Sequence, residues 1–386
     1  MKTWGEELRD LLMQAVKRRL NADVPIGIFL SGGIDSSIIT ALTCLHKPPS
    51  DIKTFSIGFH EPSFDESIYA RRVAQYLGTK HHQDFLTFQK VKTMVPNILS
   101  HIDDPVADAS YLPTYLLNRF TRNHVKVALS GDGGDELFAG YDPFKVLKLA
   151  QIYHHLTPQR VHQKIRSLAD LLPASMQNMS LDFKIKRSLK GITYPMVFCN
   201  PIWLSPLEPS DIKDLFHEPV IIEELYSEAI TYWNQCPMDN LYDKTISFYT
   251  KMYLQDDILS KVDRMSMMVS LEVRSPFIDR DVVEFVRRIP WQWKYRIGKT
   301  KYILKKAFQT ILPKDILNRK KKGFGIPLTQ WFKEDWSYWQ PNECSEHIYP
   351  NQPFIQKIIS DHQKGLSDNR LFLWAYIVAD YCFKHA

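Results

Sequence analysis

Ser31-Gly32-Gly33-Ile34-Asp35-Ser36-Ser37 is the stretch around which the rest of the chain is organised. It follows the apolar residues 26–30 and precedes the helix-like residues 38–42, so the order is buried strand, tight glycine turn and helix start. The start of a helix offers unpaired backbone N–H groups and a positive dipole end, and glycines let an anion approach the main chain. The serine hydroxyls add donors, and Asp35 is placed to hold a divalent cation. The stretch predicts a phosphate-binding loop, while a plain turn with a serine N-cap stays open from these residues alone.

A second glycine-rich stretch, Ser-Gly-Asp-Gly-Gly-Asp-Glu at residues 130–136, has the same arrangement. It follows the apolar residues 125–129 and leads into the apolar residues 137–139. In an open α/β sheet, loops that follow parallel strands gather at the carboxyl edge, where ligands bind. Mg²⁺ is normally held by one or two carboxylates together with substrate phosphates. Two carboxylate-bearing loops at one edge therefore indicate a metal–triphosphate site, and the D-x-D-x-D-G spacing of an EF-hand is absent.

These stretches resemble those of a known family. Residues 31–37 are similar to the pyrophosphate loop of the N-type ATP pyrophosphatases, and residues 130–141 are similar to the second loop of asparagine synthetases. Further similar blocks follow in family order at residues 54–59, 64–66, 77–82, 261–265, 270–279, 301–304 and 321–324. The resemblance runs from about residue 25 to 332, and an ordered set of this kind is very specific.

Composition and length describe an ordinary globular protein. The 386 residues are 44% hydrophobic and 24% charged, enough for a large core in two or three domains. No apolar run reaches the roughly 18 residues that span a bilayer, and the N-terminus lacks the apolar region of a signal peptide. Five scattered cysteines without a C-x-x-C pair are typical of reduced residues, so we expect a cytoplasmic location. The net charge of +6 suits an anionic substrate, and we expect neither nucleic acid nor a membrane as a partner.

The order of predicted elements favours an α/β fold. Strand patterns at residues 26–30, 52–59, 82–86 and 125–129 alternate with helix patterns at 3–20, 36–45, 65–78 and 88–101. This alternation predicts a doubly wound parallel sheet, and the resemblance implies the adenine-nucleotide alpha-hydrolase type. Helical periodicity dominates later, and the proline-containing residues 173–212 predict an irregular connector. We expect an α/β ATP-pyrophosphatase core over residues 1–142 and a mainly helical lobe over 143–386 that packs back on the sheet edge.

The resemblance also implies a reaction. A carboxylate attacks the α phosphorus of ATP, giving an acyl-adenylate and pyrophosphate, and ammonia or an amine then displaces AMP to form an amide. It implies ATP and Mg²⁺ as the bound groups and assigns the site residues as follows. Nucleotide-binding positions are Phe29, Leu30, Ser31, Gly32, Gly33, Asp35, Ser36, Ser37, Ile57, Ser130 and Gly131, the metal positions are Asp35 and Asp135, and the catalytic positions are Asp132, Lys301 and Glu136.

Some of these roles have plainer alternatives. Asp132 occupies the position of a residue thought to take a proton from the attacking nitrogen, but an outer-sphere role beside the metal stays open. A carboxylate beside a metal site should have a low pKa, which would make Asp132 a weak base. Phe29, Leu30 and Ile57 match positions that line an adenine pocket, and a reading as plain strand core is equally compatible.

One departure from the family concerns the nitrogen source. Glutamine-dependent asparagine synthetases begin with a glutaminase domain whose nucleophile is a cysteine next to Met1, whereas Lys2 follows Met1 here and no cysteine precedes Cys44. We therefore expect no glutamine hydrolysis by that route. The nitrogen would come from free ammonia or an amine, from a separate glutaminase subunit, or from another part of a longer protein. The carboxylate would be aspartate or another small acid, such as a sugar uronate or a natural-product acid, and a homodimer stays open.

Several other signals carry less weight. Gly298-Lys299-Thr300 resembles the end of a Walker A loop, but Trp293 stands where that motif needs glycine. The basic residues 319–322 are interpreted as part of a loop near the active site, and the paired histidines at 81–82 and 154–155 as structural or exposed. A non-catalytic ATP-binding partner of a glutaminase and a tRNA-modifying enzyme are the alternatives from other classes. The intact acidic and lysine positions argue against the first, and a dispersed positive charge argues against the second.

Overall fold

The computed structural model describes residues 3–102, 104–175, 177–319, 323, 325–340 and 349–385. Contacts group the chain into two compact units. The first comprises Met1–Val91, Ser110–Lys145 and Tyr242–Phe324, and the second comprises Lys92–Ala109, Val146–Leu241 and Gly325–Ala386. The expected division had one boundary after residue 142, whereas both units are discontinuous. The difference arises because residues 242–324 supply a strand and several helices that pack on the sheet.

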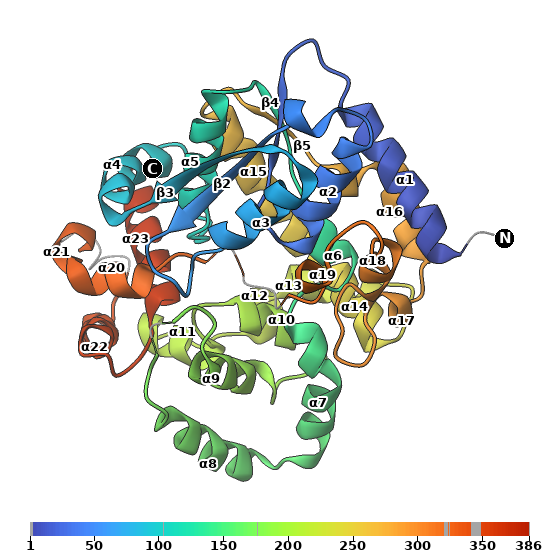
Figure 1. The fold of residues 1–386 in the computed structure, drawn as a ribbon. Coiled ribbons are helices and arrows are strands. Elements are labelled where there is room, and N and C mark those ends of the chain that lie inside the picture. Colours follow the sequence, from blue (N-terminus) through green and yellow to red (C-terminus); the bar gives the residue numbers. More distant parts are fainter. Residues whose placement is uncertain are drawn as a thin grey trace. The chain divides into compact units, whose positions relative to one another are not determined.

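The first unit is built on a five-stranded sheet in the order β3-β2-β1-β4-β5, with every neighbouring pair parallel (Figure 1). This confirms the predicted fold class. The strands are β1 Ile26–Phe29, β2 Lys53–Phe59, β3 Lys80–Leu86, β4 Val127–Leu129 and β5 Glu272–Arg274. The chain runs outward from β1 to β3 and then returns to the other side of β1, where β4 pairs with it. The strand order therefore reverses between β1 and β4, and a crevice at such a reversal is where open α/β sheets bind ligands.

Helix α1, Trp4–Arg19, begins with a capping box. The Thr3 backbone N–H donates to Glu6 Oε2 at 2.8 Å, and the Glu6 N–H donates to Thr3 Oγ1 at 3.4 Å. The helix buries Leu8 and Leu12 in a cluster shared with α2, α16, α18 and the strands β1 and β4. Burial of each leucine contributes about 1.5–3 kcal/mol, so the N-terminal helix is part of the core that supports the sheet.

The remaining helices of the first unit follow the strands in sequence. Helix α3 ends at Gly78, which has φ +75°, and the helix pattern at residues 65–78 ends at the same glycine. Helix α5 was not expected. Strand β5 was not expected either, because it is short and half polar and gives no strand pattern of its own. The helices are α2 Ile34–Cys44, α3 Ser67–Leu77, α5 Tyr111–Arg122, α6 Gly134–Leu137, α14 Leu241–Phe248, the π-helix Tyr249–Leu259, α15 Ser260–Met267, α16 Arg280–Arg288, α17 Trp291–Lys294, α18 Tyr302–Ala307 and α19 Lys314–Leu317, with 3₁₀ turns at Pro49–Asp51 and Pro276–Ile278.

The described part of the second unit contains helices and no assigned strand. Its helices are α4 Phe88–Leu99 (which begins in the first unit), α7 Pro143–Leu156 (likewise), α8 Gln159–Asp170, α9 Leu181–Gly191, α10 Met196–Leu204, α11 Pro209–Phe216, α12 Ile222–Leu225, α13 Ser227–Gln235, α20 Leu328–Glu334, α21 Trp336–Trp339, α22 Gln352–Gln363 and α23 Arg370–His385. The predicted irregular connector over residues 173–212 is wrong, since α9, α10 and the start of α11 lie there. Pro195 is an N-cap and Pro209 opens a helix, where a missing N–H costs nothing. Within the described ranges, no helix combines the length and apolar character needed to cross a bilayer.

Candidate active site

The first candidate loop, residues 31–37, joins β1 to the N-terminus of α2. Gly32 has φ +71°, and a Cβ on it would come within 2.5 Å of the Tyr69 carbonyl carbon, so only glycine fits. The Ser31 N–H donates to Ser36 Oγ at 3.2 Å, and Ser37 Oγ donates to the Gly33 carbonyl oxygen at 2.7 Å. These bonds hold the turn against the start of an 11-residue helix, the geometry that suits an anion.

The second candidate loop packs directly on the first, as the sequence predicted. A Cβ on Gly131 would lie 2.9 Å from the Ser36 backbone nitrogen, and one on Gly134 would lie 2.5 Å from Asp35 Oδ1. The backbone of one loop therefore touches the helix start of the other. The approach is this close because β1 and β4 are adjacent and both loops leave at their carboxyl ends.

Lys301 joins the two loops. Its ammonium forms ion pairs with Asp35 and with Asp135 Oδ1, the latter at 2.7 Å, and its side chain is only 6% exposed. Burial alone would lower the pKa of Lys301, but the charges of Asp135 and Asp35 outweigh it and raise the pKa above the ordinary value. The lysine is therefore cationic at any physiological pH. The structure thus brings together three predicted site residues that are far apart in sequence.

Gly140 closes the other side of this ion-paired group. A Cβ on Gly140 would lie 2.0 Å from Asp135 Oδ1 and 2.3 Å from Lys301 Cε. The Gly140 N–H also donates to the Asp135 carbonyl oxygen at 2.8 Å. Gly140 was not singled out as a site residue from the sequence, although it lies in the quoted residues 130–141. The absence of its side chain is what lets the lysine and the carboxylate meet.

Asp132 differs from its expected state. Burial raises its pKa above the ordinary value, and Asp135 adds to the shift, while the Ser130 hydroxyl and the Lys261 charge oppose it. The expected low pKa depended on a nearby metal charge, whereas burial in the folded chain by itself shifts the pKa upward. Lys261 lies on α15 and is 5% exposed. The sequence placed Lys261 in a family block but gave it no role beside Asp132.

Glu136 is held by a tyrosine. The Tyr141 hydroxyl donates to Glu136 Oε1, and the Glu136 side chain is buried. The Tyr141 ring stacks on Tyr249 with centroids 4.6 Å apart and meets Tyr253 edge-on at 5.7 Å. Burial and the Glu136 charge raise the pKa of Tyr141, so its hydroxyl stays protonated and donates. Tyr249 and Tyr253 belong to the π-helix Tyr249–Leu259, where helical periodicity over residues 245–268 predicted a helix but not the π type.

The predicted adenine-pocket residues lie on strands β1 and β2 or directly after β1. Leu30 is buried in a cluster with Ala70, Val73, Ala74 and Ile316, and its N–H donates to the Phe55 carbonyl oxygen at 2.8 Å. Ile57 is buried on β2, and Phe29 is half-buried at the end of β1. The surroundings of Leu30 fit a core position. The adenine assignment for these residues stays a prediction.

The donor set fits a magnesium–nucleotide group. The Asp35 and Asp135 carboxylates converge on one cation, Lys301 Nζ, and a pair of carboxylates completed by phosphate oxygens is how Mg²⁺ is commonly bound. Across the described ranges, no group of three or more His, Cys, Asp or Glu side chains could hold a metal by itself. A divalent ion at this place would therefore need the phosphates as ligands.

Two discounted signals find structural partners. His81 bonds with Thr54 Oγ1 at 2.9 Å and Ser56 Oγ at 3.0 Å, and burial lowers its pKa to about 4, which fits the structural interpretation. Arg319 forms an ion pair with Glu66 and lies over the Tyr69 ring at 4.0 Å. The other basic residues of that run, 320–322, and residue 324 lie outside the described residues.

Comparisons with known proteins agree with this geometry. The family model described as asparagine synthase matches residues 7–381. An asparagine synthetase [glutamine-hydrolyzing] 1 of Bacillus subtilis is 30% identical over 392 residues, which cover 97% of this chain and 58% of the relative. A putative asparagine synthetase [glutamine-hydrolyzing] of Mycobacterium bovis is 30% identical over 378 residues, covering 97% and 56%. The amidase chyE of Penicillium rubens is 26% identical over 363 residues, covering 84% and 52%. The chain spans little more than half the length of these relatives.

Proposed function

Because the chain belongs to the asparagine synthase family, we propose that it is an ATP-dependent ligase that forms an amide from a small carboxylate and ammonia or an amine. The observation that supports this most directly is the pair of carboxylates, Asp35 and Asp135, held by Lys301 beside a helix N-terminus. Such a site brings together hydrogen-bond donors for an anion, metal ligands and a fixed positive charge. These are the groups that displacement of pyrophosphate from ATP requires.

In the proposed adenylation step, residues 31–37 bind the departing pyrophosphate through backbone N–H groups and serine hydroxyls. Mg²⁺, held by Asp35 and Asp135, would offset the charge that grows on the phosphates. A metal held by Asp35 and Asp135 would compensate the charge of these two carboxylates. The Lys301 ammonium, which stays protonated, would then be available to bind the α phosphate and the acyl-adenylate.

In the proposed amide-forming step, Asp132 takes a proton from the attacking nitrogen. A raised pKa supports this role, because a carboxylate is a better base when its pKa lies nearer the working pH. The Lys261 charge opposes this rise and favours the ionised form of Asp132. Glu136, with its carboxylate bonded to Tyr141, would position the loop that carries Asp132 and Asp135.

Two substrates of one chemical class are considered. The names of the two bacterial relatives make aspartate the first carboxylate to test, and the fungal amidase supports testing a different acid, such as a sugar uronate. Ammonia is proposed as the direct nitrogen donor of this chain. A separate glutaminase subunit that delivers it is the alternative.

The test is Mg²⁺-dependent release of pyrophosphate from ATP with aspartate and ammonium, repeated with glutamine as the sole nitrogen source. Release with ammonium and formation of asparagine would support an ammonia-using asparagine synthetase. Release only with another carboxylate would keep the ligase and change the substrate. If the protein binds Mg²⁺–ATP but no carboxylate produces pyrophosphate, the ligase proposal is wrong and a non-catalytic ATP-binding role replaces it.

A further inference from the structure

One part of the second unit carries a local surplus of positive charge. Residues 146–190 contain eight Lys and Arg but two Asp, a surplus of six. A second surplus, of thirteen Lys and Arg over one Asp, lies at residues 287–322 of the sequence. Such a local surplus attracts anionic surfaces.

The same region exposes large aliphatic side chains. On α7 these are Leu149, Ile152 and Leu156, which are 66%, 46% and 75% exposed. On α8 and its C-cap they are Val161, Leu168 and Leu171, which are 47%, 67% and 79% exposed. We call these six residues the α7–α8 stripe. Within each helix they recur at spacings of three, four or seven, so they share one face.

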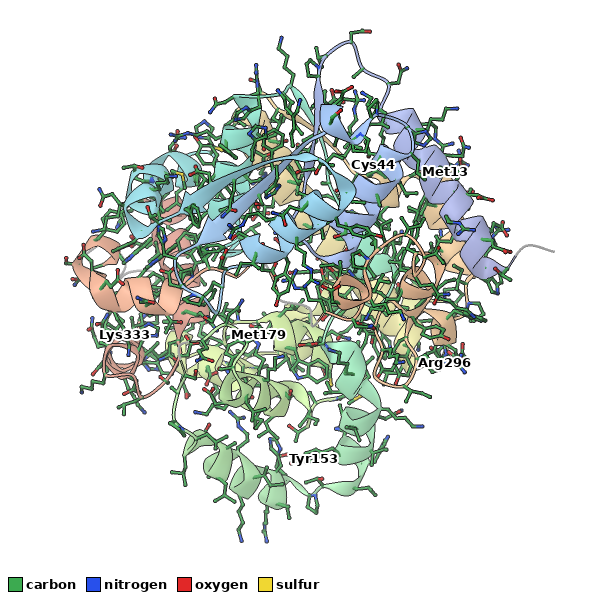
Figure 2. All side chains as sticks on the ribbon, viewed as in Figure 1. Met13, Cys44, Tyr153, Met179, Arg296 and Lys333 are labelled. Carbon is green, nitrogen blue, oxygen red and sulfur yellow. The ribbon has the colours of Figure 1, made fainter. Side chains whose placement is uncertain are left out.

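The packing of these helices shows that the stripe is not an inward face. Helix α8 buries its other side through His162 and Ala169, and its Arg166 binds Glu208 with two hydrogen bonds of 3.0 and 2.7 Å. The Tyr153 hydroxyl on α7 (Figure 2) bonds with His162 Nδ1 at 3.1 Å. Helix α8 is thus fixed by contacts on one side while Val161, Leu168 and Leu171 stay exposed, and α7 is tied to α8 through Tyr153.

Basic side chains lie along the stripe. Lys148, Arg160 and Lys164 are exposed, and none of them forms an ion pair with any residue that the structure describes. Lys164 falls between Val161 and Leu168 on the same face of α8. Leucine and lysine on one exposed helix face form an amphipathic surface whose ammonium groups can reach past the apolar atoms.

We propose that the α7–α8 stripe docks this protein on an anionic lipid surface, with the aliphatic side chains at the acyl boundary and the lysines at the headgroups. Amphipathic helices with Lys and Arg on the polar side and Leu on the other bind membranes in this way. This is peripheral contact, which the earlier expectation of no membrane partner did not consider because it rested on the absence of a spanning segment.

Other occupants fit the stripe less well. Protein interfaces favour aromatic residues, Met and Arg and are depleted in Lys, and leucine is under-represented among their hot spots. The stripe has no exposed aromatic member, since Tyr153, four residues after Leu149, is half-buried against His162. A second copy of this chain would place two basic surfaces against each other. Nucleic acid would use the basic residues but has no role for six exposed aliphatic side chains.

The test is co-sedimentation of the full chain with vesicles of phosphatidylcholine alone and of phosphatidylcholine mixed with phosphatidylglycerol. We expect binding to the mixed vesicles that falls with added salt, and little binding to phosphatidylcholine alone. Leu156→Ser with Leu168→Ser, and separately Lys148→Glu with Lys164→Glu, should each weaken binding on the order of tenfold or more. These side chains are exposed, so the melting temperature should not change.

The matched control is Leu45→Ser with Leu366→Ser, two leucines that are 60% and 63% exposed away from the stripe. This variant should bind the mixed vesicles like the parent protein. The proposal is overturned if the parent does not bind, or if the control and the stripe variants lose binding equally. It is also overturned if the stripe substitutions instead abolish self-association or binding to an RNA oligonucleotide while vesicle binding is unaffected.

Discussion

Gly140→Ala should disable the candidate site without unfolding the protein. The added methyl carbon would lie 2.0 Å from Asp135 Oδ1 and 2.3 Å from Lys301 Cε. Ordinary van der Waals contact begins at about 3.4 Å, so the carboxylate or the lysine must move by about 1.4 Å. Both groups are largely buried and paired with each other, and Lys301 is also paired with Asp35, which leaves little room for a harmless adjustment.

The size of the effect follows from this displacement. A misplacement of about 1 Å in a catalytic group can cost on the order of 100-fold in rate, equivalent to about 2.7 kcal/mol. Overpacking of this kind costs about 1–3 kcal/mol in folding free energy, which a protein of ordinary stability tolerates. We therefore expect folded protein whose kcat for pyrophosphate release is roughly a hundredth of the parent value.

The assay measures Mg²⁺-dependent pyrophosphate release with the best carboxylate found, together with Mg²⁺–ATP affinity by calorimetry and the melting temperature. Gly5→Ala is the matched control, because its new methyl group would lie 3.7 Å from the nearest Ala307 atoms, an ordinary contact. It should leave activity unchanged and stabilise α1 by up to about 1 kcal/mol. If Gly140→Ala stays folded and releases pyrophosphate within about twofold of the parent, the assigned role of this ion-paired group in catalysis is refuted.

The other predictions concern charge and pH. Lys301→Met should abolish adenylation and lower the free energy of unfolding by about 3 kcal/mol, because it leaves two carboxylates facing each other without a cation. Added Mg²⁺ should restore part of the lost melting temperature of this variant. A melting temperature that does not depend on Mg²⁺ would contradict the metal assignment. Asp132→Asn should slow amide formation far more than pyrophosphate exchange, and equal loss of both would rule out the base assignment. Because its pKa is raised, Asp132 stabilises the fold below its unfolded pKa of 3.8, and this contribution is lost as the pH rises through the raised value; denaturant titrations should show this loss in the parent and not in Asp132→Asn. Burial lowers the pKa of His81 from 6.5 to about 4, so its contribution is present above pH 6.5 and lost as the pH falls toward 4; His81→Gln should remove that acid-induced loss, and an unchanged profile would show that another group causes it.

Much of the first unit could be predicted because its signals are local. The strand, glycine turn and helix start at residues 26–44 need only apolar runs, a residue able to adopt positive φ, and hydroxyl groups at a helix start. The capping box at Thr3 and the glycine end of α3 are equally local, since each depends on residues three or four apart. The meeting of the two glycine loops followed from the rule that parallel strands present their loops at one edge.

The failures have a common origin in longer-range packing. Strand β5 has three residues, and its identity as a strand depends on pairing with β4. The helices within residues 173–212 were missed because prolines were read as breakers, although two of them lie where a helix starts. The upward shift of the Asp132 pKa could not be predicted either, because burial is a property of the folded chain.

The sequence alone determined the strand–loop–helix order, the positions of the carboxylates in the two glycine loops, and that the strands run parallel. Those features depend on neighbours in the chain. Only the tertiary structure decided which charges meet, since Lys301 reaches Asp35 across 266 residues through the packing of α18 on the sheet. It also decided the direction in which the Asp132 pKa is shifted and the exposure of the α7–α8 stripe, because desolvation and exposure depend on what packs against a side chain and not on what precedes it.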